Sequence, residues 1–301
     1  MDLSLLLDPA ILSELVFQGL VRGAMYALMG VGLALIFGIL GIVNFAQGEL
    51  FMLGTYAMFF CVSVLGLPFV VGVAAAAALL FLVGALIERG LIEPLRRRSG
   101  RNWLIDSFVL TIGLMVVLQN LALLAFGSTR RGVATLLPGS FDIGPVTITY
   151  ERLMILLVAT ALVLALGAFV KFTPLGKAIR ATAQHPEAAQ TLGIDTPRIY
   201  TISFGIGAAL AGAAGALLIS IFPAFPTVGY QPSLKAFAVV ILGGLGNVVG
   251  AIAGGILLGI VEAYAIFFLS AGWQNVLTPI VIILVLILRP QGLFTRQGER
   301  P

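Results

Sequence analysis

Cysteine and histidine are almost absent from this chain of 301 residues, which contains one of each, Cys61 and His185. A single cysteine excludes an intramolecular disulfide. A single histidine leaves almost no material for Cys/His metal sites or for Ser-His-Asp and Cys-His catalysis. We therefore expect no resident metal and no catalytic centre in this chain, which indicates that it is not an enzyme.

Charge is also scarce. Only 10% of the residues are charged and 60% are hydrophobic, with a mean hydropathy of +1.11, whereas about a quarter of an ordinary soluble domain is charged. Thirteen acidic and 17 basic side chains cannot cover a soluble body of this size, so the apolar surface must face the lipid bilayer. The net charge of +4 is spread between apolar runs without a continuous basic stripe, which argues against a nucleic-acid partner.

Two short signals are missing. The segment 1–14 contains no Lys or Arg, so it lacks the positive region of a secretory signal. No Gly-x-x-x-x-Gly-Lys-Ser/Thr phosphate loop occurs, and Gly176-Lys177 is followed by Ala178. If the protein is a pump, its ATPase must be a separate chain, so ATP and Mg²⁺ are expected on partner subunits and no cofactor on this one.

Long uncharged runs predict membrane helices, since a span needs about 20 mostly apolar residues. The longest run, from Leu50 to Ile87, is broken by the turn signal Gly66-Leu67-Pro68. The predicted spans are 16–41, 46–65, 69–87, 104–126, 152–170, 199–222, 234–264 and 273–289. The seventh can be two pieces hinged at Gly243-Gly244. The sequence thus predicts an all-α polytopic membrane protein with eight or nine transmembrane helices, some interrupted, in one transmembrane domain over residues 1–301.

Basic residues predict the orientation, because Lys and Arg accumulate on the cytoplasmic side. Twelve of the 17 lie in the segments 88–103, 171–198 and 289–301. These are therefore predicted to be cytoplasmic, with an external N-terminus. The loop 127–151 is then external, although it contains Arg130 and Arg131.

Glycine and polar residues mark two interruptions inside apolar sequence. One is Asn44 to Glu49, at the start of the stretch Asn44 to Leu65, and the other is Gly243 to Asn247, at the start of the stretch Leu242 to Tyr264. Both resemble broken helices, and they are candidates for corresponding parts of an inverted repeat. The runs Gly205–Gly215 and Gly243–Gly259 are rich in glycine, which allows close helix packing in lipid or a sliding or hinging helix pair.

The segment 171–198 reads as two short cytoplasmic helices. Thr173 can cap the first with Pro174 at its first position, Pro186 can open the second, and Gly193 can close it. A helix pair of this kind can transmit motion from a soluble partner, whereas composition alone would make it an ordinary connecting loop.

Three motifs give the chain a resemblance to a known family. They are Gly41-Ile-Val-Asn-Phe-Ala-Gln-Gly-Glu-Leu50, Gly176-Lys-Ala-Ile-Arg-Ala-Thr-Ala183 with Glu187-Ala-Ala189, and Lys235-Ala-Phe-Ala-Val-Val-Ile-Leu-Gly-Gly-Leu-Gly-Asn247. The chain resembles the inner-membrane permease subunits of ATP-binding-cassette (ABC) importers for branched-chain amino acids, over nearly its whole length. Position 47 is Gln where that family commonly has His, which argues against proton transfer there.

The resemblance implies a bacterial inner-membrane subunit that forms half of a translocation pathway. Its implied partners are a second homologous permease, two cytoplasmic ATPases and an external solute-binding protein. Because that external protein would select the solute, we expect no tight site in this chain. The implied ATPase-coupling residues are Gly176, Lys177, Arg180, Glu187, Ala188, Ala189, Gly193 and Asp195.

Charges and interruptions inside the spans supply candidates for the pathway or its hinges: Asn44, Gln47, Glu49, Gly243, Gly244, Gly246, Asn247 and Glu262. Glu49 and Glu262 either line the pathway or pair with Arg22, Arg89 or helix ends, and Arg22 is expected to reach outward to the membrane interface. Alternatives are a permease of the same type for urea, amides, aromatic acids or other amino acids, and an ion-coupled secondary transporter.

Overall fold

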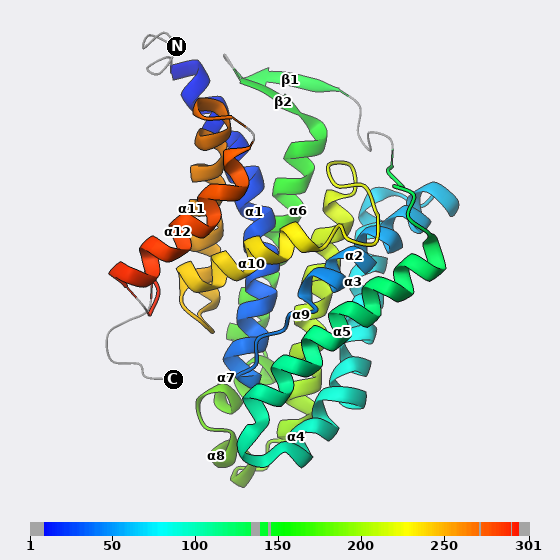
Figure 1. Ribbon diagram of the computed structural model, residues 1–301, viewed down its shortest axis with the longest axis vertical. Helices are drawn as coiled ribbons and strands as arrows, with labels where there is room; N and C mark the ends of the chain where they lie inside the picture. Colours follow the sequence, from blue (N-terminus) through cyan, green and yellow to red (C-terminus); the bar gives the residue numbers. More distant parts are fainter. Residues whose placement is uncertain (1–8, 134–138, 144–145, 271, 290, 295–301) are drawn as a thin grey trace.

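The computed structural model describes residues 9–133, 139–143, 146–270, 272–289 and 291–294 (Figure 1). The helices and strands are α1 Pro9–Leu40, α2 Gln47–Phe59, η2 Phe60–Val64, α3 Phe69–Ile87, η3 Glu88–Ile92, α4 Glu93–Ser99, η4 Gly100–Asn102, α5 Trp103–Phe126, β1 Ser140–Ile143, β2 Val146–Thr149, α6 Tyr150–Phe172, α7 Pro174–Gln184, α8 Pro186–Thr191, α9 Thr196–Leu218, α10 Tyr230–Gly243, α11 Val248–Phe268 and α12 Trp273–Leu288. The predicted all-α membrane architecture is confirmed, with one small antiparallel hairpin, β1–β2, added to it.

Seven of the described helices are long and apolar enough to cross a bilayer, fewer than the eight or nine predicted. The difference lies in α10 and α12, which have 14 and 16 residues. At 1.5 Å per residue, α10 is about 21 Å long, shorter than the roughly 30 Å hydrocarbon core. The predicted interruption at Gly243-Gly244 is confirmed, because α10 ends there and α11 begins at Val248.

The predicted loop 88–103 is wrong. Helical structure continues from Phe69 to Ser99 without a gap, through a π-helical turn at Glu88–Ile92. Glu88 ends the uncharged run but its side chain is fully buried, so the first charge marks neither the end of the helix nor its exit from the protein.

The two ends of the molecule differ in structure. In Figure 1 the hairpin β1–β2 lies at the same end as the start of α1, whereas α7, α8 and α4 lie at the opposite end. Arg130 and Arg131, which precede the hairpin in the chain, lie over the rings of Phe225 and Phe59. These cation–π contacts give both guanidinium groups local partners, which accounts for two arginines on the predicted external side.

The core is built from two groups of three helices. Helices α1, α2 and α3 form one group, and α9, α10 and α11 form the other. The main packing is reciprocal, since α1 packs on α11 and α9 on α3, while α2 packs on α9 and α10 on α1. Helices α1 and α9 run in opposite directions (Figure 1). The opposite directions and the reciprocal packing agree with the predicted inverted repeat, which stays a prediction.

Matched in chain order, the two groups of helices would pair different segments from those that the sequence suggested. Helix α2 corresponds to α10, which precedes the Gly243 interruption, so the stretch Asn44 to Leu65 does not match Leu242 to Tyr264. The sequence pattern aligned two polar interruptions, but the structure matches the short helices that follow α1 and α9.

Glycine brings these short helices into backbone contact. A Cβ atom on Gly229, just before α10, would lie 1.9 Å from the carbonyl oxygen of Gly48 in α2. A Cβ atom on Gly54 would lie 2.2 Å from the carbonyl oxygen of Gly212 in α9. Contacts this close are possible only without side chains, as expected for helix packing in lipid.

We predict that Gly54→Ala destabilises the protein by about 1–3 kcal/mol, because the added methyl group must push α2 away from α9. Gly113→Ala in α5 is the matched control, since no atom lies within 4 Å of the position that its added methyl group would take. Thermal unfolding of both variants in the same detergent measures the difference. Equal stability of the two would show that the α2–α9 contact is not close-packed.

Candidate functional site

A buried ion pair ties the C-terminal helices together. Lys235 of α10 donates a hydrogen bond to the carboxylate of Glu262 in α11, and Tyr26 of α1 donates to the other carboxylate oxygen over 2.7 Å. Thr278 of α12 donates to Glu262 over 2.9 Å. Glu262 is completely buried, and its charge is compensated by Lys235, a partner that the sequence did not suggest.

The predicted residues between α1 and α2 form a second buried polar group. The Asn44 side chain accepts a hydrogen bond from the Ala46 amide over 3.1 Å and donates to Gln47 over 3.2 Å. Gln47 in turn donates to the Gly207 carbonyl of α9 over 3.3 Å. These hydrogen bonds stabilise the interruption between α1 and α2 and join α2 to α9. Glu49 is also buried, and its Oε2 has no hydrogen-bond partner among the described residues.

The second interruption has a defined backbone. Gly244 and Gly246 adopt φ angles of +96° and +83°, which favour glycine. Asn247 caps α11 by accepting a hydrogen bond from the Gly250 amide over 2.9 Å. Gly243 lies against the backbone of Gly250. The interruption is thus a tight glycine corner between α10 and α11, and its predicted role as a hinge stays a prediction.

The predicted coupling segment 171–198 contains two helices, as expected. Thr173 accepts a hydrogen bond from the Gly176 amide over 3.0 Å and so caps α7, while Asp195 caps α9 through the Arg198 amide over 3.2 Å. Gly193, with a φ of +84°, follows the end of α8.

The exposure of this segment leaves most of its predicted coupling residues accessible. Exposed among them are Lys177, Arg180, Glu187, Ala188, Gly193 and Asp195, whereas Gly176 and Ala189 are buried. Leu192, which is not among the predicted coupling residues, is 82% exposed. Helix α8 and the residue after it therefore present an acidic and an apolar side chain on the surface.

A further polar cluster at the same end was missed. The buried carboxylate of Glu88 accepts a hydrogen bond from Thr201 of α9 and forms an ion pair with Arg96 at 3.2 Å. Arg96 also lies 4.1 Å from the ring centroid of Tyr200. The sequence signal was present as an acidic residue in an apolar helix, but the predicted end of the span at residue 87 concealed it.

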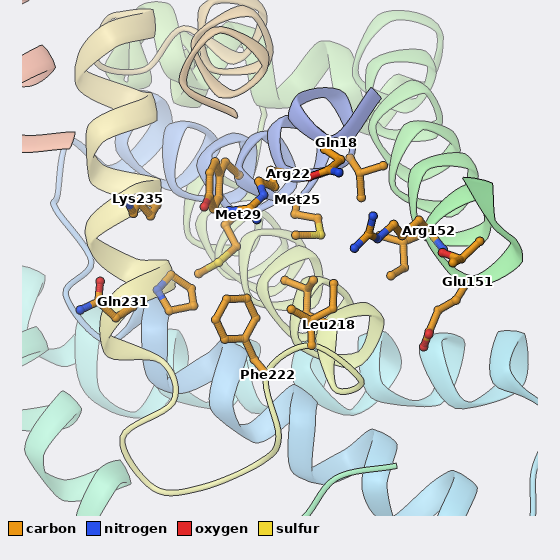
Figure 2. Close-up of a pocket in the computed structure, with 16 residues that line it drawn as sticks. Gln18, Arg22, Met25, Met29, Glu151, Arg152, Leu218, Phe222, Gln231 and Lys235 are labelled. Carbon is orange, nitrogen blue, oxygen red and sulfur yellow. The ribbon is translucent and has the colours of Figure 1, made fainter. Parts of the chain in front are cut away.

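A cavity of about 610 Å³ lies between α1, α6, the end of α9 and α10 (Figure 2). This size lies within the usual range for small-molecule sites. Its apolar lining includes Val21, Met25, Met29, Ile155, Leu218, Ile221, Phe222 and Pro232. Its charged lining consists of Arg22, Glu151, Arg152 and Lys235. An apolar cavity with a few charged groups fits a small polar solute with an apolar part.

Most of the charged groups of this cavity were not predicted from the sequence. Arg22, expected to reach outward to the membrane interface, lines it instead, and Glu151 and Arg152 enter from the first turn of α6. None of the predicted pathway residues lies in its lining. Their pathway role stays a prediction. Across the described part of the chain, no three His, Cys, Asp or Glu side chains converge as a metal site would require.

The fold and the cavity define a multi-pass membrane protein with interrupted helices and a solute-sized cavity within the bundle. Residues 15–288 match the family described as "Branched-chain amino acid transport system / permease component". The chain belongs to this family.

Curated relatives extend over almost the full length. The chain is 36% identical over 293 residues to the Pseudomonas aeruginosa "High-affinity branched-chain amino acid transport system permease protein BraD", covering 93% of this chain and 94% of BraD. It is 34% identical over 294 residues to LivH of Escherichia coli K12, with the same coverage. The Yersinia enterocolitica "Autoinducer 2 import system permease protein LsrC" is 29% identical over 62% of this chain and 53% of LsrC. No solved structure matches the chain significantly.

We predict that Lys235→Met destabilises the protein by about 3–5 kcal/mol, because it leaves the buried Glu262 carboxylate without its cation. The double variant Lys235→Met/Glu262→Leu removes both charges and should recover most of that loss. Thermal unfolding in detergent compares the three proteins. If the single and double variants lose the same stability, the ion pair is not the source of the effect.

Proposed function

We propose that this chain is the permease subunit of an ABC importer and forms half of the translocation pathway for branched-chain amino acids. One observation carries the solute class: the similarity to BraD and LivH, whose names specify branched-chain amino acid transport, covers 93% of the chain. The apolar lining of the cavity, with charged groups at its walls, is consistent with such a solute.

The proposed partners are those of the ABC importer permeases that the chain resembles, and the exposed groups indicate where they would bind. The chain acts as a transport subunit without its own ATPase site, paired with a second homologous permease. Two cytoplasmic ATPases, which carry ATP and Mg²⁺, would bind α7 and α8, and an external solute-binding protein would deliver the solute at the hairpin end. The exposed α8 lies at the opposite end of the molecule from the hairpin β1–β2 (Figure 1). The cavity lining includes Thr149 at the end of β2 and Glu151 in the first turn of α6, as expected if the energy source and the solute act from opposite sides.

A different solute is the second candidate, and the similarity to LsrC supports it, because the name of that relative specifies autoinducer 2. Urea, amides, aromatic acids and other amino acids belong to this alternative. Reconstitution of the complete complex in proteoliposomes, followed by uptake of radiolabelled leucine, tests the assignment. We expect uptake that requires hydrolysable ATP and the binding protein and that is displaced by isoleucine and valine.

Two results would contradict the proposed function. Leucine uptake without ATP that stops when an ionophore dissipates the ion gradient would indicate a secondary transporter. ATP-driven uptake of another solute, with no competition by leucine, would indicate a permease of the same type with a different substrate.

We predict that Leu192→Asp and Glu187→Arg each lower ATPase co-purification and ATP-driven uptake about tenfold or more, since exposed anchor residues dominate interfaces. Both side chains are exposed, so stability should change by less than about 0.5 kcal/mol. Ser140→Asp, an exposed position in β1, is the control at the other end. Unchanged ATPase binding in both variants would exclude α8 as the docking element.

A further inference from the structure

We propose that the cavity between α1, α6, α9 and α10 is a low-affinity binding site for an α-amino acid zwitterion with an aliphatic side chain, in which Arg22 and Arg152 bind the carboxylate and Glu151 binds the ammonium group. This inference rests on the proposed function, which names the solute but gives it no site in this chain.

Arg22 and Arg152 enter the cavity from two different helices, α1 and α6 (Figure 2). Neither guanidinium group has a hydrogen bond or an ion pair within the part of the chain that the structure describes. Arg22 is half-buried within α1, where a charge is costly and is usually retained for function, whereas Arg152 is exposed in the first turn of α6. A guanidinium group binds a carboxylate through two parallel hydrogen bonds, so a pair of them facing one cavity favours a carboxylate ligand.

Glu151 supplies the opposite charge. Its Oε1 atom is buried and has no hydrogen-bond partner among the described residues, although the side chain lines the cavity. A buried carboxylate oxygen normally accepts at least one hydrogen bond. The ammonium group of a bound amino acid would provide it.

Two further ionisable groups near the cavity, Lys235 and Glu14, have partners within the chain. Lys235 pairs with Glu262, and Glu14, which lies beside Arg22 in a smaller adjoining cavity, accepts a hydrogen bond from Gln18. The groups left for a ligand therefore have both signs. A simple carboxylate would leave Glu151 without a partner, and a simple amine would leave the two arginines without one, whereas a zwitterion satisfies both.

The apolar wall fits the aliphatic side chain of the ligand. Met25 and Met29 of α1 face Leu218 and Phe222 across the cavity (Figure 2). Methionine is flexible and polarisable and adapts to apolar groups of different shape. A wall of this composition accommodates leucine, isoleucine and valine without distinguishing strongly among them.

Low affinity agrees with passage through the membrane. A solute on a pathway must bind well enough to enter and weakly enough to leave. No tight site is expected in this chain if an external protein selects the solute, and a weak site inside the bundle is compatible with that expectation.

The test uses the reconstituted complex of permease and ATPase subunits and measures leucine binding without the external protein. We expect weak, saturable binding of leucine, with 4-methylpentanoate, which lacks the ammonium group, and 3-methylbutylamine, which lacks the carboxylate, each binding about tenfold or more weakly. The expectation follows from the loss of a hydrogen bond to a charged group.

Variants locate the site. Arg22→Gln, Arg152→Gln and Glu151→Gln should each weaken leucine binding and raise the half-saturating concentration for uptake about tenfold, while ATPase co-purification is retained. Arg22→Lys should recover part of the loss. Arg89→Gln removes an exposed arginine of η3, next to α4 in the chain and outside the cavity lining, and is the matched control.

Ile221→Trp, at a cavity position that is 47% exposed, should obstruct the cavity, whereas Ile221→Val should not.

The outcomes separate this proposal from the proposed function. ATP-driven leucine uptake that is unaffected by all three charge variants and by Ile221→Trp overturns the cavity site and leaves the function intact. Equal binding of leucine and both analogues also overturns it. Absence of leucine uptake by the intact complex, with another solute transported, overturns the proposed function itself.

Discussion

Lipid provides neither hydrogen bonds nor counter-charges, and this constraint accounts for where the helices of this protein can break. Both interruptions carry their own polar partners, the first one buried at Asn44 and Gln47 and the second one partly exposed at Leu245. Asn44 and Gln47 form hydrogen bonds with backbone groups at the interruption between α1 and α2, and Asn247 caps α11 just after α10 ends. The short helices α2 and α10 can therefore start or end within the bundle, because protein groups supply what water supplies elsewhere.

The charged groups of α1, α6, α10 and α11 discussed above fall into two sets with different surroundings. Lys235 and Glu262 are paired within a network that joins α1, α10, α11 and α12, and such a pair fixes one arrangement of helices more than it adds stability. Arg22, Arg152 and Glu151 face a cavity instead and have no ion-pair partners among the described residues. The first group belongs to the architecture, and the second is available to a solute.

Much of this organisation could be predicted from the sequence, and there is a physical reason why the rest could not. Local signals, such as the cap at Thr173, Gly193 after α8 and the interruption at Gly243-Gly244, were predicted because the partners are neighbours in the chain. The partner of Glu262 lies 27 residues away, and Tyr26 lies 236 residues away, so no local pattern reveals them. The same limit explains the mispaired repeat and the missed cluster around Glu88, which depend on packing between distant helices.

Lys235 belongs both to the cavity lining and to the buried ion pair. It forms part of the cavity lining, and its ammonium group joins Glu262 and Thr278 on α11 and α12. One residue of the cavity lining thus also connects α10 to α11 and α12. The cavity cannot widen on that side unless the Lys235–Glu262 ion pair moves with it. A change in the shape of the cavity is therefore coupled to a movement of the C-terminal helices.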